Sequence, residues 1–237
     1  MTNLTTEVNQ SVLASLIDSQ DIDLKHVYFF DTLADTKRSF FQTLRQHGVR
    51  RILEKLLGLI FRNVQTRIAK ITGTELQPQN CFELVTKKQV PFSLIQNMNA
   101  KNCRDHLAES EAEYLIVCVC KNILRKPVLE QLDCTAINIH PSLLPEYRGP
   151  MPTYWIRKHK RSQTGVTIHL MTPGIDDGPI LAQMAMPLSE TDSVRTIEKN
   201  LFRLAADKLP GTLLDLHNGV IKPRPQDEEQ ATYYGFP

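Results

Sequence analysis

Apolar positions along the chain occur either in short runs or at helical spacing, and each such stretch predicts a secondary-structure element. Short apolar runs predict strands at 26–30, 91–96, 114–119, 135–139, 165–171 and 180–184. Helical spacing of apolar positions predicts helices at 8–17, 40–70, 99–109, 127–132 and from Asp192 onward. Asn97 or Asn99 is the expected N-cap of the third helix, and Pro210 should break or restart the last one.

The order of these elements predicts an α/β fold. Two buried strands, 114–119 and 135–139, are joined by a short helical piece, which is typical of a parallel crossover. We therefore expect an open, mostly parallel sheet flanked by helices, with an atypical N-terminal strand because the first residues are polar. Glycine is sparse before Gly149, so tight turns and a loop-borne site are expected in the later part of the chain.

The composition narrows the class of protein. The 237 residues are 41% hydrophobic and 23% charged, and the formal net charge of +2 is too small to favour nucleic acid or an anionic membrane as a partner. No apolar run reaches bilayer-spanning length, and the N-terminus is unlike a secretory signal, so we expect a soluble cytoplasmic protein. The five cysteines lack the CxxC spacing of zinc or redox sites, which indicates small buried side chains.

The predicted helix at 40–70 is basic. A basic amphipathic helix can bind RNA or a membrane surface. A helix packed on the core with a solvated basic face explains the same pattern, and we favour that interpretation. RNA binding would show as an affinity that falls steeply with salt. The basic residues are Arg45, Arg50, Arg51, Lys55, Arg62, Arg67 and Lys70.

The first candidate site is the stretch AINIHPSLLPEYRG at 136–149. Its strand turns polar at the carboxyl end, where alternation places Asn138 and His140 on one side of the chain. Pro141 and Pro145 prevent continuation as a regular inner strand. Open α/β sheets bind ligands at the carboxyl ends of their strands, although an edge histidine capped by its loop gives the same pattern.

The second candidate site is the stretch GVTIHLMTPGIDDGPILAQ at 165–183, where a loop between two strands carries Asp176 and Asp177. An acidic pair in such a loop is by itself compatible with an ordinary turn. His169 suggests a metal site with His140 and Asp176, but the histidine spacing of zinc sites is missing, so we expect no metal. Neither GxGxxG nor GxxxxGK[ST] occurs, which argues against a dinucleotide or P-loop nucleotide site.

Together the two stretches, and more weakly KNILRKPVLEQL at 121–132, resemble the folate-dependent formyltransferase family. That family includes glycinamide ribonucleotide transformylase, methionyl-tRNA formyltransferase and the sugar N-formyltransferases. The resemblance covers roughly residues 97–220, with both motifs in the family's order and spacing. It implies a Rossmann-like formyltransferase fold, with a catalytic domain at 1–221, whose N-terminal half at 1–96 is divergent, and a C-terminal tail at 222–237.

The resemblance also implies the roles of individual residues. The catalytic trio would be Asn138, His140 and Asp176, with 10-formyltetrahydrofolate as co-substrate and no metal. The donor-binding positions would be Ile123, Leu124, Thr172, Pro173, Gly174 and Ile175. The acceptor-binding positions would be Tyr147, Arg148 and Gly149.

These residue types suit formyl transfer, because an amine that attacks a formyl carbon builds an oxyanion and an ammonium. Asn138 and a protonated His140 could donate hydrogen bonds to the oxyanion. The histidine could also move a proton from the attacking amine to the leaving nitrogen, with Asp176 orienting its ring or relaying protons through water.

The acceptor is expected to be a small amine. The chain ends at Pro237, which we expect leaves no room for the C-terminal β-barrel of methionyl-tRNA formyltransferases. YRG followed by prolines and aromatics resembles the sugar N-formyltransferases, which favours a nucleotide-linked amino sugar, and the ending QDEEQATYYGFP resembles segments of both the tRNA and the sugar enzymes. A nucleotide base could stack on Tyr233, Tyr234 or Phe236. The same aromatics could instead pack to fix the tail.

Other activities stay open at this point. The chain could act on glycinamide ribonucleotide or on charged tRNA, could hydrolyse formyltetrahydrofolate, or could be a non-catalytic binding protein with this fold. We expect neither a nucleic-acid partner nor a membrane, and the sequence leaves a homodimer open.

Overall fold

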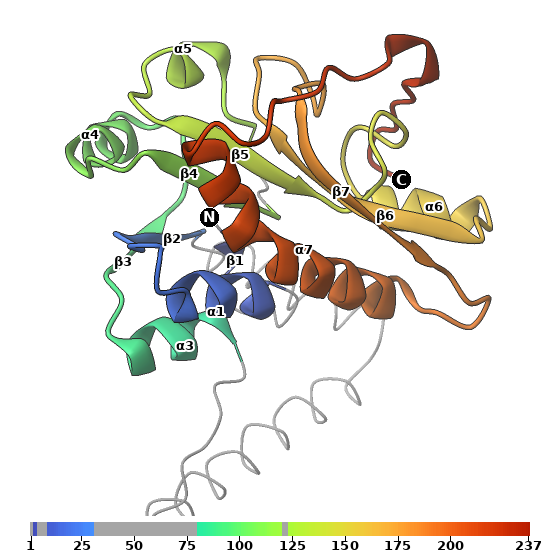
Figure 1. Ribbon diagram of the computed structural model, residues 1–237, viewed down its shortest axis with the longest axis horizontal. Helices are drawn as coiled ribbons and strands as arrows, with labels where there is room; N and C mark the ends of the chain where they lie inside the picture. Colours follow the sequence, from blue (N-terminus) through green and yellow to red (C-terminus); the bar gives the residue numbers. More distant parts are fainter. Residues whose placement is uncertain (1, 4–8, 31–79, 120–122) are drawn as a thin grey trace, which may run out of the picture.

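The computed structural model describes residues 2–3, 9–30, 80–119 and 123–237, and their strands form two sheets (Figure 1). The first is parallel, in the order β1 (Thr2–Asn3), β2 (Val27–Phe30) and β3 (Phe92–Ile95). The second has the order β4 (Tyr114–Cys118), β5 (Thr135–His140), β6 (Gln163–Leu170) and β7 (Ile180–Pro187). The predicted parallel pairing of β4 with β5 is confirmed, whereas β6 and β7 are antiparallel.

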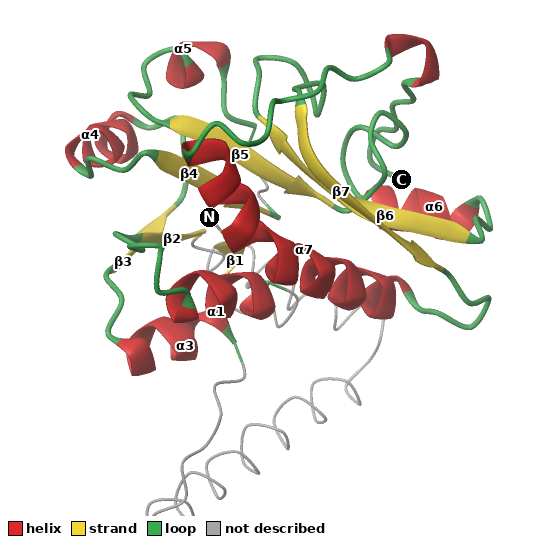
Figure 2. Ribbon diagram, viewed as in Figure 1, coloured by secondary structure: helices red, strands yellow, loops and turns green. Residues whose placement is uncertain are grey.

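Helices flank both sheets, as Figure 2 shows. They are α1 (Gln10–Asp18), α3 (Cys81–Lys88), α4 (Lys101–Glu109), α5 (Lys126–Leu129), α6 (Pro152–Lys158) and α7 (Val194–His217). A short 3₁₀ turn, η1 (Glu228–Gln230), lies in the tail. The α/β class expected from the sequence is therefore confirmed, and none of the described helices is both long and apolar enough to cross a membrane.

The core follows from the alternation of side chains along β5. Ile137 and Ile139 are buried against α7 and α1, in a cluster that includes Leu201 and Phe202. Ala136 faces the opposite side, in a second cluster that contains residues of α4 and α5. Asn138 and His140 lie on the same face of β5 as Ala136, so two polar side chains emerge at the carboxyl end of a strand whose other face buries Ile137 and Ile139.

The N-terminal region differs from the expectation in one respect. The first clear strand, expected at 26–30, is β2, but the two-residue β1 at Thr2–Asn3 pairs with it in parallel. A polar two-residue strand carries no apolar alternation, so the sequence pattern did not reveal it. The predicted basic helix at 40–70 lies outside the described residues.

Pro210 does not break α7, which contradicts the prediction from the sequence. The helix runs from Val194 to His217 with Pro210 inside it. An interior proline costs a helix roughly 3 kcal/mol. Leu201 and Leu213, on either side of Pro210, are both buried in the core, and packing on both sides holds the helix together through the proline.

The predicted cap of α4 is also wrong. The N-cap residue is Ala100, and it makes no side-chain capping hydrogen bond. The Asn97 side chain instead accepts a hydrogen bond from the backbone N–H of Asn99. Asn99 bonds to the segment that follows β4: its Nδ2 donates to the carbonyl oxygen of Ile123, and its Oδ1 accepts from the N–H of Arg125. Both asparagines therefore organise the loop before α4, which left neither free to cap the helix.

Candidate active site

The antiparallel pairing of β5 with β6 brings the two motifs of the sequence together. Asn138 lies directly opposite His169, and His140 lies opposite Thr167. The Thr167 hydroxyl donates to the carbonyl oxygen of Ser142 and accepts from the N–H of Leu144. The loop that leaves β5 is thereby anchored to β6 immediately beyond His140.

Asp176 is the residue on which the predicted trio converges. Asn138 Nδ2 donates to Asp176 Oδ1 at 3.2 Å, and His140 Nδ1 lies 3.5 Å from Asp176 Oδ2. The N–H of Gly149 also donates to Oδ2, at 2.9 Å. Asp176 itself adopts a left-handed conformation with a φ of 53°, which non-glycine residues adopt only when their surroundings hold them there. Three residues that lie 27 to 38 positions earlier in the sequence thus meet around one carboxylate.

The ring of His140 has a defined orientation. Its Nε2 lies 2.8 Å from the carbonyl oxygen of Tyr147. Because a carbonyl oxygen can only accept, Nε2 carries a hydrogen, and Nδ1 is the nitrogen that faces Asp176 and can exchange a proton. His140 is only 4% exposed, so its ring is largely shielded from solvent.

His169 is a site residue whose role the sequence did not reveal. Its Nδ1 lies 2.8 Å from the carbonyl oxygen of Leu170 and therefore carries the hydrogen. Its unprotonated Nε2 faces Asn138 Nδ2 at 3.2 Å, so the two amide hydrogens of Asn138 point to His169 and Asp176. Burial, reinforced by the nearby His140, lowers the pKa of His169 to about 4. The sequence contained one indication of this position, because strand alternation places His169 on the same face of β6 as Thr167.

Replacing His169 with glutamine should make the free energy of unfolding depend less on pH between pH 6.5 and pH 4. In the wild type, the pKa of His169 in the folded protein lies below the ordinary value of 6.5. Between these two pKa values the unfolded chain binds a proton at His169 and the folded protein does not. Stability should therefore fall by up to about 3 kcal/mol as pH drops through this window, and level off below it. Urea unfolding at several pH values measures this, with the exposed His217→Gln as control. If the free energy of unfolding changed equally with pH in the wild type and in His169→Gln, this prediction would be wrong.

The loop after β6 is closed by its second aspartate. The hydroxyl of Thr172 donates to the Asp177 carboxylate, and a Cβ on Gly174 would collide with the same carboxylate. A Cβ on Gly178 would lie 1.9 Å from the carbonyl oxygen of Leu170, so only glycine allows the loop to return against β6. Asp177 thus shapes the loop, while Asp176 points into the trio.

The donor-binding positions implied by the resemblance lie on two segments. Pro173, Gly174 and Ile175 are exposed on the loop after β6. On the segment after β4, Ile123 is 62% exposed, whereas Leu124 is buried in the core. Ile123 and Ile175 therefore offer accessible apolar surface, and Leu124 contributes its backbone and anchors the segment.

The acceptor-binding positions implied by the resemblance are buried. Tyr147, Arg148 and Gly149 follow one another between the trio and the tail. The Arg148 guanidinium is held by two hydrogen bonds to Glu228 and two to Gln226. At Gly149 a Cβ would lie 2.3 Å from the carbonyl oxygen of Tyr234, and the φ of 98° also favours glycine.

The C-terminal tail is fixed against this loop by backbone and ring contacts. Arg148 pairs with Tyr233 in an isolated bridge, and the Tyr234 ring stacks between Tyr147 and Trp155 at centroid distances of 5.2 and 5.3 Å. Tyr234 is therefore a packing residue. Tyr233 and Phe236 remain 56% and 78% exposed.

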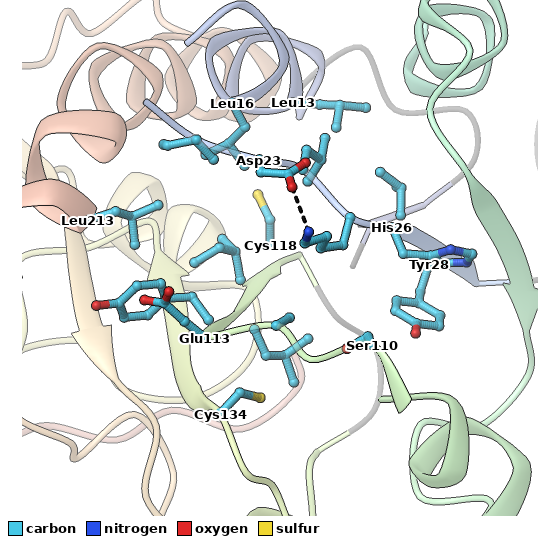
Figure 3. Close-up of a pocket in the computed structure, with 18 of the residues that line it drawn as sticks. Leu13, Leu16, Asp23, His26, Tyr28, Ser110, Glu113, Cys118, Cys134 and Leu213 are labelled. Atoms are coloured by element: carbon cyan, nitrogen blue, oxygen red, sulfur yellow. Dashed lines mark ion pairs between the residues drawn. The ribbon is translucent and has the colours of Figure 1, made fainter. Parts of the chain in front are cut away.

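A cavity of about 520 Å³ lies elsewhere, between the two sheets, lined by α1, β2 and β4 (Figure 3). None of its lining residues belongs to the trio. The cavity therefore lies apart from the converging polar groups around Asp176. In the described part of the chain, no three His, Cys, Asp or Glu side chains are arranged to hold a metal ion.

Comparisons with known proteins identify what this arrangement is similar to. The family model "Formyl transferase" matches residues 60–213. A methionyl-tRNA formyltransferase from Microcystis aeruginosa is 33% identical over 163 residues, which are 68% of this chain and 50% of that protein. The chain thus spans about half the length of the curated relatives it matches.

Solved structures share the fold. The phosphoribosylglycinamide formyltransferase of Anaplasma phagocytophilum has a TM-score of 0.65 at 14% identity, with 100% of this chain and 96% of that chain covered. An N-formyltransferase from Helicobacter canadensis, solved with folinic acid and dTDP-3-aminofucose, has a TM-score of 0.52 at 17% identity, with 69% and 56% covered.

Proposed function

Because the chain belongs to the formyl transferase family, we propose that it transfers a formyl group from 10-formyltetrahydrofolate to the amine of an acceptor. The observation that carries this proposal is the convergence of Asn138, His140 and Asp176 at the carboxyl end of β5, with separations of 3.2 and 3.5 Å. Such a group of polar side chains at this edge of an α/β sheet is where ligands bind.

The residues of the trio have complementary tasks in this reaction. Attack by the amine forms a C–N bond and an oxyanion, and the bond to the folate nitrogen then breaks as that nitrogen takes up a proton. When Nδ1 of His140 carries a proton, it and Asn138 Nδ2 are both donors that face the Asp176 carboxylate, and a formyl oxygen that enters beside the carboxylate can accept from them in its place. His140 Nδ1 moves the proton, since Nε2 is committed to the carbonyl oxygen of Tyr147.

The donor is placed by the segments after β4 and β6. A pterin ring is flat and carries several hydrogen-bonding edges, so it suits backbone groups flanked by apolar side chains. The exposed Ile123 and Ile175 lie on these segments, and Leu124 anchors the first of them in the core. The chemistry of the residues present therefore fits a reduced folate.

A nucleotide-linked amino sugar is the acceptor we propose first. The exposed Tyr233 lies beside Gly149, whose N–H donates to Asp176, and the exposed Phe236 follows in the same tail; either ring can stack on a base. The Helicobacter canadensis relative, solved with an amino-sugar nucleotide, lends support at the level of the fold.

Charged tRNA is the second candidate acceptor. It is favoured by a different observation, the 33% identity to the methionyl-tRNA formyltransferase of Microcystis aeruginosa. The two candidates differ in salt dependence, because binding of tRNA weakens steeply as salt rises, whereas binding of a small sugar nucleotide changes little.

Calorimetric titration with a stable 10-formylfolate analogue tests the donor site without any assumption about the acceptor. We expect one site per chain and weaker binding by Asp176→Ala. Formylation assays with amino-sugar nucleotides, glycinamide ribonucleotide and charged tRNA then identify the acceptor. Absence of analogue binding by folded protein would overturn the proposal, and consumption of the donor without any acceptor would indicate a hydrolase.

A further inference from the structure

The side chain of Gln226, in the tail, is bonded to both loops of the trio. Its Nε2 donates to the carbonyl oxygens of Asp176 and Gly178, at 2.8 Å each. Its Oε1 accepts from Nε and Nη2 of Arg148, at 3.1 and 2.9 Å. Both hydrogens and both lone pairs of one amide are therefore in use, and they join segments that lie about 50 and 78 residues away in the sequence.

The first pair of bonds acts on the backbone that presents Asp176. This residue has a φ of 53°, a conformation that persists in a non-glycine residue only when neighbouring groups over-determine it. Gly178, two residues later, is packed against Leu170 of β6 without room for a Cβ. Gln226 binds the carbonyls on both sides of Asp177, so it fixes the turn from which the Asp176 carboxylate points into the trio.

The second pair of bonds acts on the loop that holds His140. Arg148 follows Tyr147, whose carbonyl oxygen accepts the Nε2 hydrogen of His140. The same guanidinium is held by Glu228 through two further bonds, at 2.9 and 2.6 Å. The amide of Gln226 thus connects the residue that carries the carboxylate with the loop that sets the histidine ring.

We propose that Gln226 is a positioning residue, which holds the Asp176 carboxylate in register with His140 by bonding both loops at once. This inference rests on the proposed formyl transfer and extends it to a residue that lies outside both motifs of the sequence.

The tail does not depend on Gln226 for its docking. Arg224 pairs with Ile180 through two backbone hydrogen bonds, of 2.7 and 2.8 Å. Further along, Thr232 accepts from the N–H of Arg148, and the N–H of Tyr234 donates to the carbonyl oxygen of Arg148. A change of the Gln226 side chain therefore leaves the tail attached on both sides, and its effect should be confined to the two loops.

Gln226→Glu is the sharpest variant. It keeps the shape and the acceptor for Arg148, but it loses both donors and sets a carboxylate oxygen against two carbonyl oxygens. We expect kcat to fall about 10- to 100-fold, because two partly buried hydrogen bonds are replaced by repulsion. The donor KM should change by less than about threefold, since a misplaced carboxylate affects the transition state more than ground-state binding. Gln226→Ala, which adds no charge, should lower kcat in the same direction.

Gln230→Glu is the matched control. Gln230 is exposed in the same tail, and among the described residues its side chain bonds only to Asp227, the cap of η1. The same chemical change there should leave kcat within about twofold, because exposed charge changes contribute little. An unchanged kcat in Gln226→Glu, or a raised KM with unchanged kcat, would overturn the inference.

Hydrogen–deuterium exchange separates this inference from the proposed function. In the unliganded protein, the peptide covering residues 172–178 should exchange faster in Gln226→Glu than in the wild type or in Gln230→Glu. Equal exchange would overturn the positioning role even if formyl transfer is established. If the wild type transferred no formyl group at all, the proposed function would be wrong. Gln226 would then have no role in catalysis, whatever the rate of hydrogen–deuterium exchange.

Discussion

Replacing Asp176 with asparagine should lower kcat for formyl transfer by about 10²- to 10⁴-fold, the range expected when a group that supports proton transfer is lost. Asparagine is nearly isosteric and tolerates the left-handed conformation with a φ of 53°, so the loop should keep its shape. One carboxylate oxygen would become an NH₂ group, which must face either Asn138 Nδ2 or the N–H of Gly149, both of them donors. Steady-state kinetics with saturating donor measure the effect.

Asp177→Asn is the control for this experiment. Asp177 is the next residue, has the same chemistry, and accepts from the hydroxyl of Thr172, which an amide oxygen can still do. Its kcat should stay within about tenfold of the wild type, because one neutral hydrogen bond replaces a charged one. A loss in Asp177→Asn equal to that in Asp176→Asn would show that the loop's charge matters and not the geometry of the trio.

The second large effect is expected for His140. His140→Ala should reduce kcat by about 10²- to 10⁴-fold, because it removes both a donor to the oxyanion and the group that carries the proton. His140→Gln should be nearly as inactive. Its amide can still donate to the carbonyl oxygen of Tyr147 and fills most of the volume, but it cannot exchange a proton.

The pair of His140 variants separates an enzyme from a binding protein of the same fold. Analogue binding should be retained in His140→Gln while turnover is lost, and His217→Ala, an exposed histidine paired with Glu113, should behave as the wild type. Wild-type levels of turnover in either His140 variant would contradict the assignment of the trio.

The sequence predicted the second sheet well because its strands are apolar and bounded by turns. β4, β5, β6 and β7 all lie within a few residues of their expected positions. It failed where local propensity and packing disagree: Pro210 lowers helix propensity, but burial of the neighbouring residues of α7 outweighs it. The N-cap of α4 failed because the side chains of Asn97 and Asn99 found other backbone partners nearby.

The trio was proposed from the sequence because its members lie in motifs that resemble those of a known family, and the structure brings the three side chains together. The groups that orient it could not be named in this way. His169 was considered only as a metal ligand, since the strand register that places it opposite Asn138 is a tertiary property. Gln226 sits in an irregular tail, and nothing local to residue 226 indicates that its amide meets carbonyls 48 and 50 residues earlier.

The direct cross-strand pairing of Asn138 with His169 has a practical consequence for protein engineering. The two strands are hydrogen-bonded partners, so their register is fixed by the ladder and not by the length of the connection between them. The length of the connection at 150–162 can therefore be changed without shifting Asn138 relative to His169, as long as Trp155 of α6 keeps its stacking on Tyr234.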